Sequence, residues 1–406
     1  MILINKLSDC KCYFCLTEIY FAVTETKQKI YFPGLNGLRF FASFAVIITH
    51  TELIKMAFGF ENSWKHPIIF NLGGLGVFFF FVLSGFLITY LLLAEKESTN
   101  TISIKEFYLR RIFRIWPLYY LIFILGFFIL PHFFELHITY LENDFNRYYK
   151  NQFWTYLLIL PNLGYAMHGA IPHIGHLWTI GVEEQFYLLW PLLLKTNKKI
   201  LRLLLLLIIG LVTFKLLVLL LSITHYDFPF VIGLKNFIAM LKIECMAIGG
   251  IGAYILFYKK NMILKIVYNF WTHVLAWVSI PLLIYFTPEK LQNGNHIVYS
   301  IAFLVIILNV AGNKKSFVKL ENKIMHSLGS ISYGIYMYHL MLIPIILLFI
   351  KKLLTPLNSG LLFNAILYTA VISTTCLISF LSYNFFEKKF LLLKRKYTNI
   401  ISGEPS

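Results

Sequence analysis

Two ionisable residues stand at the ends of the otherwise apolar stretch RFFASFAVIITH, which begins with Arg39 and ends with His50. They are 11 positions apart, which on an α-helix is three turns plus about 20°, so both side chains share one face about 16 Å apart along the axis. Ionisable groups inside membrane helices usually face the bundle interior and mark a functional site, where an imidazole can act as a base. The alternative is that Arg39 reaches the inner headgroups and His50 only bonds a neighbouring helix.

Two adjacent carboxylates, Glu183 and Glu184, lie in the stretch HLWTIGVEEQFYLLWP. This segment is predicted to run from the outside inward, which would place both glutamates at the depth of His50. A carboxylate that faces an imidazole fixes its tautomer and makes it a better base. We therefore expect one glutamate to face His50. An ion pair that only holds two helices together is the alternative.

Three arginines, Arg110, Arg111 and Arg114, lie in the stretch FYLRRIFRIWP, at the inner end of a predicted crossing. Arg111 and Arg114 are about one helical turn apart and share a face. Two guanidinium groups on one face suit a phosphate or a pyrophosphate. The alternative is that these arginines anchor the helix at the inner membrane surface.

Other polar side chains interrupt two more apolar stretches. Ser84 and Gly85 lie in GGLGVFFFFVLSGFLI, where the small residues permit close helix packing. Tyr336 and His339 lie in ISYGIYMYHLML, which is predicted to run from the inside outward, with His339 in the inner half of the membrane. Ser84, Tyr336 and His339 could line a substrate path; simple helix packing is the alternative.

The elements that must position these residues are membrane helices. Of the 406 residues, 58% are hydrophobic and 14% are charged, whereas soluble domains average about 25% charged residues. Apolar runs near the length needed to cross a bilayer recur along the chain, so an all-α integral membrane bundle is predicted. Ten crossings are expected, at residues 35–56, 70–93, 112–130, 177–195, 200–221, 237–258, 273–287, 296–311, 332–350 and 361–386. The apolar residues 153–165 are shorter, and a re-entrant or interfacial helix is expected there.

Positive charge gives the predicted orientation. With the N-terminus in the cytoplasm, the inner segments carry 25 Lys and Arg and the outer segments carry 8. Cytoplasmic loops are enriched in these residues, so both termini are predicted to be cytoplasmic. The net charge of +17 then reflects orientation, and no nucleic-acid partner is expected. The predicted parts are a leader (1–32), a transmembrane domain (33–390) and a tail (391–406).

The cysteines predict no disulfide framework. Cys10, Cys12 and Cys15 in the leader have a spacing that could suit a metal, but no paired Cys or His set follows, so no metal is expected. Residues 1–34 lack the compact apolar core and cleavage site of a signal peptide. The role of the leader stays open.

Six segments of the chain, taken together, resemble the acyltransferase-3 family of integral membrane O-acyltransferases, over about residues 33–390. They are, in order, PGLNGLRFFASFAVIITH with its R-x10-H, GVFFFFVLSGFLI, the R-x-x-R of RRIFRIWP, HLWTIGVEEQFYLLWP, SYGIYMYHL and YNFFEKKF. R-x10-H alone is a weak pattern, but all six segments in this order are specific. One departure is mild: where the family often has W-S-L, this chain has Trp178-Thr179-Ile180, which keeps a hydroxyl.

The resemblance implies a ten-helix core that transfers an acyl group, often acetyl, from cytoplasmic acyl-CoA to a hydroxyl. It implies that His50 is the catalytic histidine and that Arg39 supports the site. Arg111 and Arg114 match the R-x-x-R proposed to hold the coenzyme. Glu183 matches the glutamate of the pattern W-x-x-x-x-E-x-x-F-Y.

The resemblance also implies an enzyme class, a location and partners. The class is an acyltransferase that transfers groups other than aminoacyl groups, with acetyl-CoA as co-substrate and no metal. The location is the plasma (inner) membrane of a bacterium, in contact with membrane lipid, and the acceptor is a carbohydrate or glycolipid, such as a cell-surface glycan. The acceptor, the acyl chain length and the oligomeric state stay open.

The mechanism hypothesis joins these residues by depth. Arg111 and Arg114 hold the coenzyme phosphates at the inner mouth, the pantetheine arm reaches inward, and His50, oriented by Glu183, removes the proton of an acceptor hydroxyl. An acyl-histidine relay is equally open. A protein of another class, a transporter or flippase for a lipid-linked sugar, also fits a multi-span chain with buried charges, although no internal repeat is present.

Overall fold

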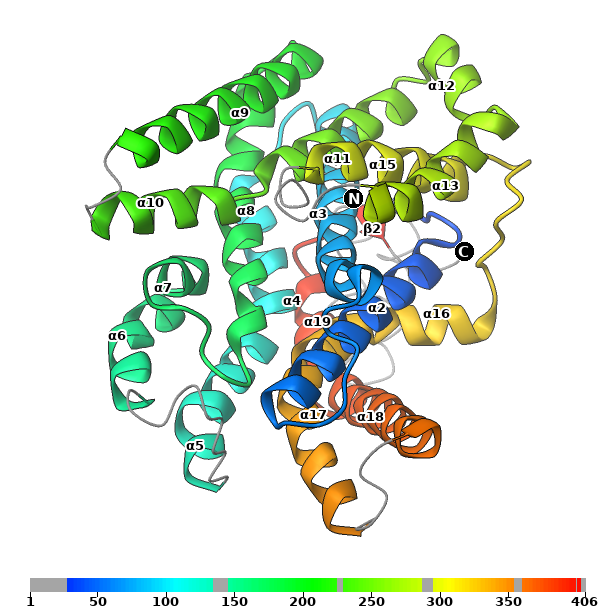
Figure 1. Cartoon of the computed structure of the whole chain (residues 1–406). Coiled ribbons are helices and arrows are strands. Elements are labelled where there is room, and N and C mark those ends of the chain that lie inside the picture. The colour runs from blue at the N-terminus through cyan, green and yellow to red at the C-terminus, as the bar shows by residue number, and fades with distance from the viewer. Residues whose placement is uncertain are drawn as a thin grey trace, which may run out of the picture.

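The computed structural model describes residues 28–133, 145–224, 229–286, 295–353, 360–398 and 400–402, and helices dominate it (Figure 1). The longer helices are α2 (Leu35–Ala57), α3 (Pro67–Thr99), α4 (Ile104–Ile124), α8 (Trp178–Thr196), α9 (Ile200–Thr224), α10 (Pro229–Met240), α11 (Ile243–Phe257), α13 (Phe270–Phe286), α15 (His296–Gly312), α17 (Ser332–Leu353) and α18 (Gly360–Ser382). The shorter elements are β1 (Gln28–Ile30), η1 (Leu125–Ile129), α5 (Leu130–Phe133), α6 (Phe145–Leu157), α7 (Pro161–His168), η2 (Gly175–Leu177), α12 (Asn261–Val267), α16 (Lys323–Ser330), η3 (Tyr383–Glu387), α19 (Lys388–Arg395) and β2 (Ile400–Ser402).

The prediction of an all-α membrane protein is confirmed. Each of the ten predicted crossings coincides with helical residues, although that at 237–258 is divided between the end of α10 and α11. Within the described ranges, seven helices are long and apolar enough to cross a membrane, or eight if the bent pair α12 and α13 is one span. Of the other two, α8 carries two glutamates and α15 has 17 residues. The number of crossings and the cytoplasmic side of the termini therefore stay predictions.

The surface of α9 is suited to lipid. Leu206, Ile209, Leu220 and Ile223 are each more than half exposed. A helix that is apolar all round is stable only when it is buried in protein or surrounded by a membrane. Because α9 lies at the edge of the bundle in Figure 1, its surroundings are the membrane.

Glycines allow α3 and α11 to cross at very close range. A Cβ on Gly85 would lie 1.9 Å from the carbonyl oxygen of Met246, and a Cβ on Gly249 would lie 1.9 Å from that of Val82. Small residues permit this approach between membrane helices. The crossing fixes the position of α3 and with it that of Ser84, the neighbour of Gly85.

Helix α2 lies between two apolar clusters. Val46 belongs to the larger cluster, which includes residues of α3, and Ile47 belongs to a smaller cluster formed with α17 and α18. The hydroxyl of Ser43 donates to the carbonyl oxygen of Ser332 in α17 at 3.3 Å. The face of α2 that was predicted to carry the chemistry is therefore held against α17.

The apolar residues 153–165 do not form one long helix. They are divided between α6, with 13 residues, and α7, with 8 residues, and Ile159 at the break has a φ of 59°. A helix rises 1.5 Å per residue, so neither helix can cross a bilayer. The expectation of a short helix, rather than an eleventh crossing, is confirmed.

A short two-stranded sheet joins segments from opposite ends of the chain. In it, β1 pairs in parallel with β2, and Gln28 lies opposite Ile400. Next to β1, the hydroxyl of Tyr31 and the amide of Gly34 both donate to the carboxylate of Glu321. The described parts of the predicted leader and tail are thus joined to each other and to the bundle. Cys10, Cys12 and Cys15 lie outside the described residues.

Gly85→Ala is expected to destabilise the bundle by about 1–3 kcal/mol, because the added methyl group must separate α3 from α11. Gly74→Ala is the matched control, since nothing lies within 4 Å of a Cβ at Gly74 and alanine is the better helix former. The measurement is the thermal unfolding midpoint of the detergent-solubilised protein. Equal midpoints for the two variants would contradict the close crossing.

Candidate active site

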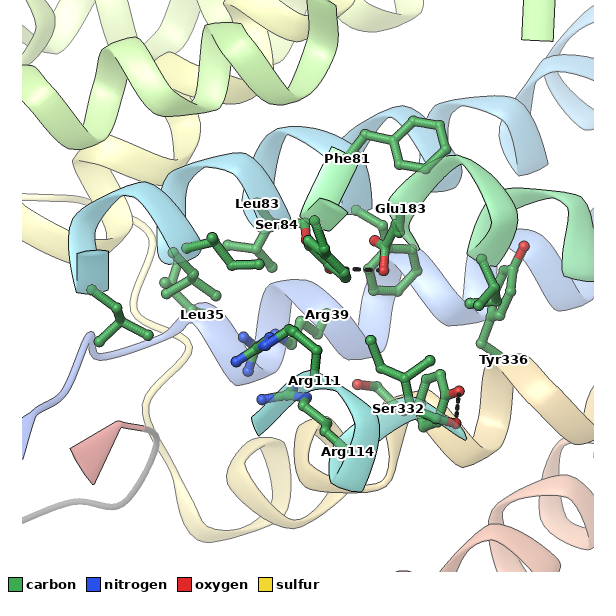
Figure 2. A pocket seen from close by; sticks show the side chains of 18 of the residues that line it. Leu35, Arg39, Phe81, Leu83, Ser84, Arg111, Arg114, Glu183, Ser332 and Tyr336 are labelled. Atoms are coloured by element: carbon green, nitrogen blue, oxygen red, sulfur yellow. Dashed lines mark hydrogen bonds between the residues drawn. The ribbon is translucent and has the colours of Figure 1, made fainter. Parts of the chain in front are cut away.

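A cavity of about 1350 Å³, counted with its open mouth, lies between α2, α3, α4, α8 and α17 (Figure 2). Six of the eight residues singled out from the sequence line it, namely Arg39, Ser84, Arg111, Arg114, Glu183 and Tyr336. The remaining two, His50 and His339, are not among the lining residues. The cavity therefore joins the predicted anion-binding residues but leaves the predicted catalytic histidine outside.

Three guanidinium groups gather in this cavity, one from α2 and two from α4 (Figure 2). Arg39 Nη1 donates to Asn36 Oδ1 at 2.9 Å, and Arg111 lies 5.7 Å from the centre of the Tyr187 ring. In the described part of the chain, Arg39, Arg111 and Arg114 form no ion pair with a carboxylate, and Arg111 Nε is buried without a hydrogen-bond partner. Arg39 and Arg111 are half-buried and Arg114 is exposed. Because guanidinium groups pair well with anionic oxygens, a cavity that holds three of them is suited to an anionic ligand.

The carboxylate of Glu183 is held by a short chain of hydroxyl groups. Tyr187 Oη donates to Glu183 Oε2 at 2.9 Å and lies 2.5 Å from Ser84 Oγ. A tyrosine hydroxyl has one proton, so Ser84 is the donor to Tyr187. Glu184 points elsewhere and accepts from Trp116 Nε1 at 3.1 Å.

The expected contact between Glu183 and His50 is not made. His50 Nδ1 lies 3.1 Å from the carbonyl oxygen of Val46 and 3.0 Å from His339 Nε2. The ring of His176 packs against that of His339, with centroids 4.9 Å apart. His50, His176 and His339 thus form a histidine cluster, and among the described residues no carboxylate bonds to it.

The depth of His339 also differs from the prediction. The Ser43–Ser332 and His50–His339 contacts have the same sequence separation of 289, so α2 and α17 run parallel in one register. His339 therefore lies at the level of His50 and not closer to the predicted inner end of the bundle. The prediction assumed that both helices begin at the membrane surface, whereas α17 begins beside Ser43, well inside the span of α2.

The start of α8 explains the position of Glu183. His176 Nε2 lies 3.2 Å from the carbonyl oxygen of Met337, so α8 begins at the level of the histidine cluster. The turn before it is buried, and Ile174 has no exposed surface. Glu183 follows His176 by seven positions, or about 10 Å of helix, and this distance carries it to the arginines.

Tyr336 separates the cavity from the histidine cluster. Its hydroxyl lies 2.7 Å from Thr179 Oγ1 and donates to the carbonyl oxygen of His176 at 3.1 Å. Its ring packs against those of His176 and His339, with centroids 5.4 and 5.6 Å apart. Figure 2 shows Tyr336 at the end of the cavity away from Leu35.

Sequence reasoning missed two functional candidates, His176 and Tyr187. His176 is one of five histidines between the predicted crossings at 112–130 and 177–195, so nothing in its spacing distinguished it. Tyr187 follows Glu183 by four positions, which places both on one helix face. That spacing was the available signal for the Tyr187–Glu183 bond.

A family model described as an acyltransferase domain matches residues 32–384. The chain belongs to the acyltransferase-3 family. This match confirms the resemblance that the six motifs carried, and it covers all the residues of the cavity except Ile30 and Tyr31.

Several bacterial proteins that are named as O-acetyltransferases are similar to this chain. The O-acetyltransferase OatA of Staphylococcus aureus is 29% identical over 88% of this chain, and the putative peptidoglycan O-acetyltransferase YrhL of Bacillus subtilis is 28% identical over 90%. The peptidoglycan O-acetyltransferase OatA of Listeria monocytogenes is 32% identical over 41%. These alignments cover 57%, 55% and 25% of the relatives, so the chain spans little more than half the length of the first two. No solved structure matches significantly.

Arg110, the first arginine of the RRIFR segment, has a structural role. Its Nη2 lies 2.7 Å from Glu95 Oε2, and its Nη1 donates to the carbonyl oxygen of Tyr397 at 2.9 Å. The side chains of Arg110 and Glu95 are 11% and 5% exposed. Arg110 therefore ties α3 and α4 to the segment after α19 and does not line the large cavity.

Arg110→Ala is expected to destabilise the protein by about 3 kcal/mol, because it leaves the Glu95 carboxylate buried and unpaired. Arg114→Ala, on the same helix, removes no ion pair with a described carboxylate and is expected to leave the thermal unfolding midpoint nearly unchanged. The Arg110→Ala/Glu95→Ala double variant should be more stable than the sum of the single effects predicts. Equal shifts for Arg110→Ala and Arg114→Ala would contradict this division of roles.

Proposed function

We propose that this protein is a membrane O-acetyltransferase that moves an acetyl group from cytoplasmic acetyl-CoA to a hydroxyl of a cell-surface glycan. The observation that carries the proposal is the cavity with three guanidinium groups that lack a carboxylate partner in the described part of the chain, next to the histidine cluster. Family membership supplies the reaction class. The proposed location is the plasma membrane of a bacterium.

The donor fits the cavity by charge. Arg111 and Arg114 would bind its phosphate groups, because guanidinium groups pair well with phosphate oxygens. Arg39, from α2, lines the same cavity and would add a third positive charge. The pantetheine arm would then extend past Ser84 towards Tyr336. No metal is part of this proposal.

His50 would act as the general base. It takes the proton of the acceptor hydroxyl, whose oxygen bonds to the acetyl carbonyl carbon while the carbon–sulfur bond breaks. The proton then passes from His50 to the coenzyme A thiolate. An acyl-histidine relay would use the same residue as nucleophile. In either case the thioester must pass Tyr336, because that side chain separates the cavity from His50.

The acceptor is proposed from chemistry and from the relatives. Two of the relatives are named as peptidoglycan O-acetyltransferases, one of them putative. His50 is partly exposed, and in the predicted orientation it is reached from the outer side. A polysaccharide or glycolipid hydroxyl outside the cytoplasm is therefore the acceptor class that we propose.

Membranes that contain the wild-type protein are expected to transfer label from acetyl-CoA, labelled in the acetyl group, to glycan as an alkali-labile ester. His50→Ala should reduce the rate at least about 100-fold, the lower range for loss of a general base. Protein levels and unfolding midpoints serve as the control. Undiminished transfer by His50→Ala would overturn the histidine assignment, and movement of a sugar lipid without ester formation would favour a transporter.

Arg111→Ala combined with Arg114→Ala should raise the KM for acetyl-CoA at least about tenfold and change the KM for the acceptor much less, because each charge-assisted bond contributes about 1.5–3 kcal/mol. Arg202→Ala is the control, since Arg202 is exposed on α9 and does not line the cavity. Initial rates at varied donor and acceptor concentrations give both constants. An unchanged donor KM would contradict the phosphate role.

A further inference from the structure

The hydrogen bonds of the histidine cluster determine which nitrogen of His50 carries a proton. A carbonyl oxygen can only accept a hydrogen bond. His50 Nδ1 lies 3.1 Å from the carbonyl oxygen of Val46, so Nδ1 carries the hydrogen. In the neutral ring the other nitrogen, Nε2, then has the free lone pair.

The second contact of His50 Nδ1 agrees with this assignment. His339 Nδ1 lies 2.6 Å from the carbonyl oxygen of Tyr336, so it carries a hydrogen by the same argument. Neutral His339 must then present an acceptor at Nε2. That atom lies 3.0 Å from His50 Nδ1, so the His50 N–H is shared between Val46 and His339.

The third ring adds another acceptor. His176 Nε2 lies 3.2 Å from the carbonyl oxygen of Met337 and carries the hydrogen. His176 Nδ1 is left with a lone pair, and it is buried without a hydrogen-bond partner. His176 therefore supplies a further basic nitrogen beside His339, and it interacts electrostatically with His50.

We propose that His339 is a positioning residue that holds His50 in the Nδ1–H tautomer and so makes Nε2 the basic atom. In the proposed function, on which this inference rests, His50 Nε2 takes the acceptor proton. The Nδ1–H bond to His339 then becomes a bond from a charged donor, which is about twice as strong as a neutral one. A neutral imidazole performs here the orienting task that we expected of the Glu183 carboxylate.

The fold supplies this arrangement through the register of α2 and α17. Both His50–His339 and Ser43–Ser332 keep the separation of 289. Each histidine is also tied to the backbone of its own helix, His50 to Val46 and His339 to Tyr336. Each ring is therefore held by a carbonyl group of its own helix and by the other ring, as an orienting pair requires.

Substitutions at His339 that keep or remove a hydrogen-bond acceptor at the position of Nε2 test the proposal. The side-chain amide of glutamine reaches the position of Nε2, whereas that of asparagine reaches only the position of Nδ1. His339→Gln is expected to keep at least about a tenth of the wild-type kcat. His339→Asn and His339→Met should lower kcat about 100-fold or more, in the range for loss of a working general base, with the KM for acetyl-CoA within about twofold.

His273→Gln is the control for loss of a buried histidine, because His273 bonds Trp277 on α13, outside the cluster. Unfolding midpoints show which variants are folded, and the two non-accepting variants, Asn and Met, provide independent tests. A kcat near wild type in a folded Asn or Met variant would overturn the proposal, and so would His339→Gln as inactive as His339→Met. If the wild type transfers no acetyl group, the proposed function fails, whereas loss of activity in His50→Ala but not in His339→Asn overturns only this inference.

Discussion

The bundle must accommodate Arg39, Arg111 and Arg114 in one cavity, although none of them has a carboxylate partner among the described residues. Like charges that share a cavity repel. The surrounding helices therefore need strong contacts elsewhere. The glycine crossing of α3 and α11 and the buried Arg110–Glu95 pair supply such contacts on two sides of the cavity.

The repulsion between the arginines also bears on why the ionisable groups lie in two separate places. Glu183 lies with the arginines, held by Tyr187, and the histidines lie beyond Tyr336 without a carboxylate in contact. A carboxylate beside the guanidinium groups moderates their repulsion, which favours its place in the cavity. His50 is then oriented by neutral groups alone, and the cluster carries no buried charge until a proton arrives.

The sequence predicted the helices, their faces and the meeting of Arg111 with Arg114, because these follow from the period of 3.6 residues. It also predicted that Arg39 and His50 share a face of α2; Arg39 lines the cavity, and His50 contacts His339 of α17. It did not predict depth. Apolar length shows that a helix crosses the membrane, but the starting point of α8 depends on the buried turn before it, and that of α17 on its packing against α2. These tertiary contacts leave no periodic signal.

Tyr336 has a consequence for the cell as well as for the proposed reaction. If donor and acceptor enter from opposite faces, the protein contains a route through the bilayer, and a continuous column of water along it would conduct protons and discharge the membrane potential. The hydroxyl of Tyr336 is hydrogen-bonded to Thr179, and its ring packs on two imidazoles, so this side chain would interrupt such a column of water. In the proposed reaction, the side chain that the acyl group must pass would therefore also prevent proton leakage across the membrane.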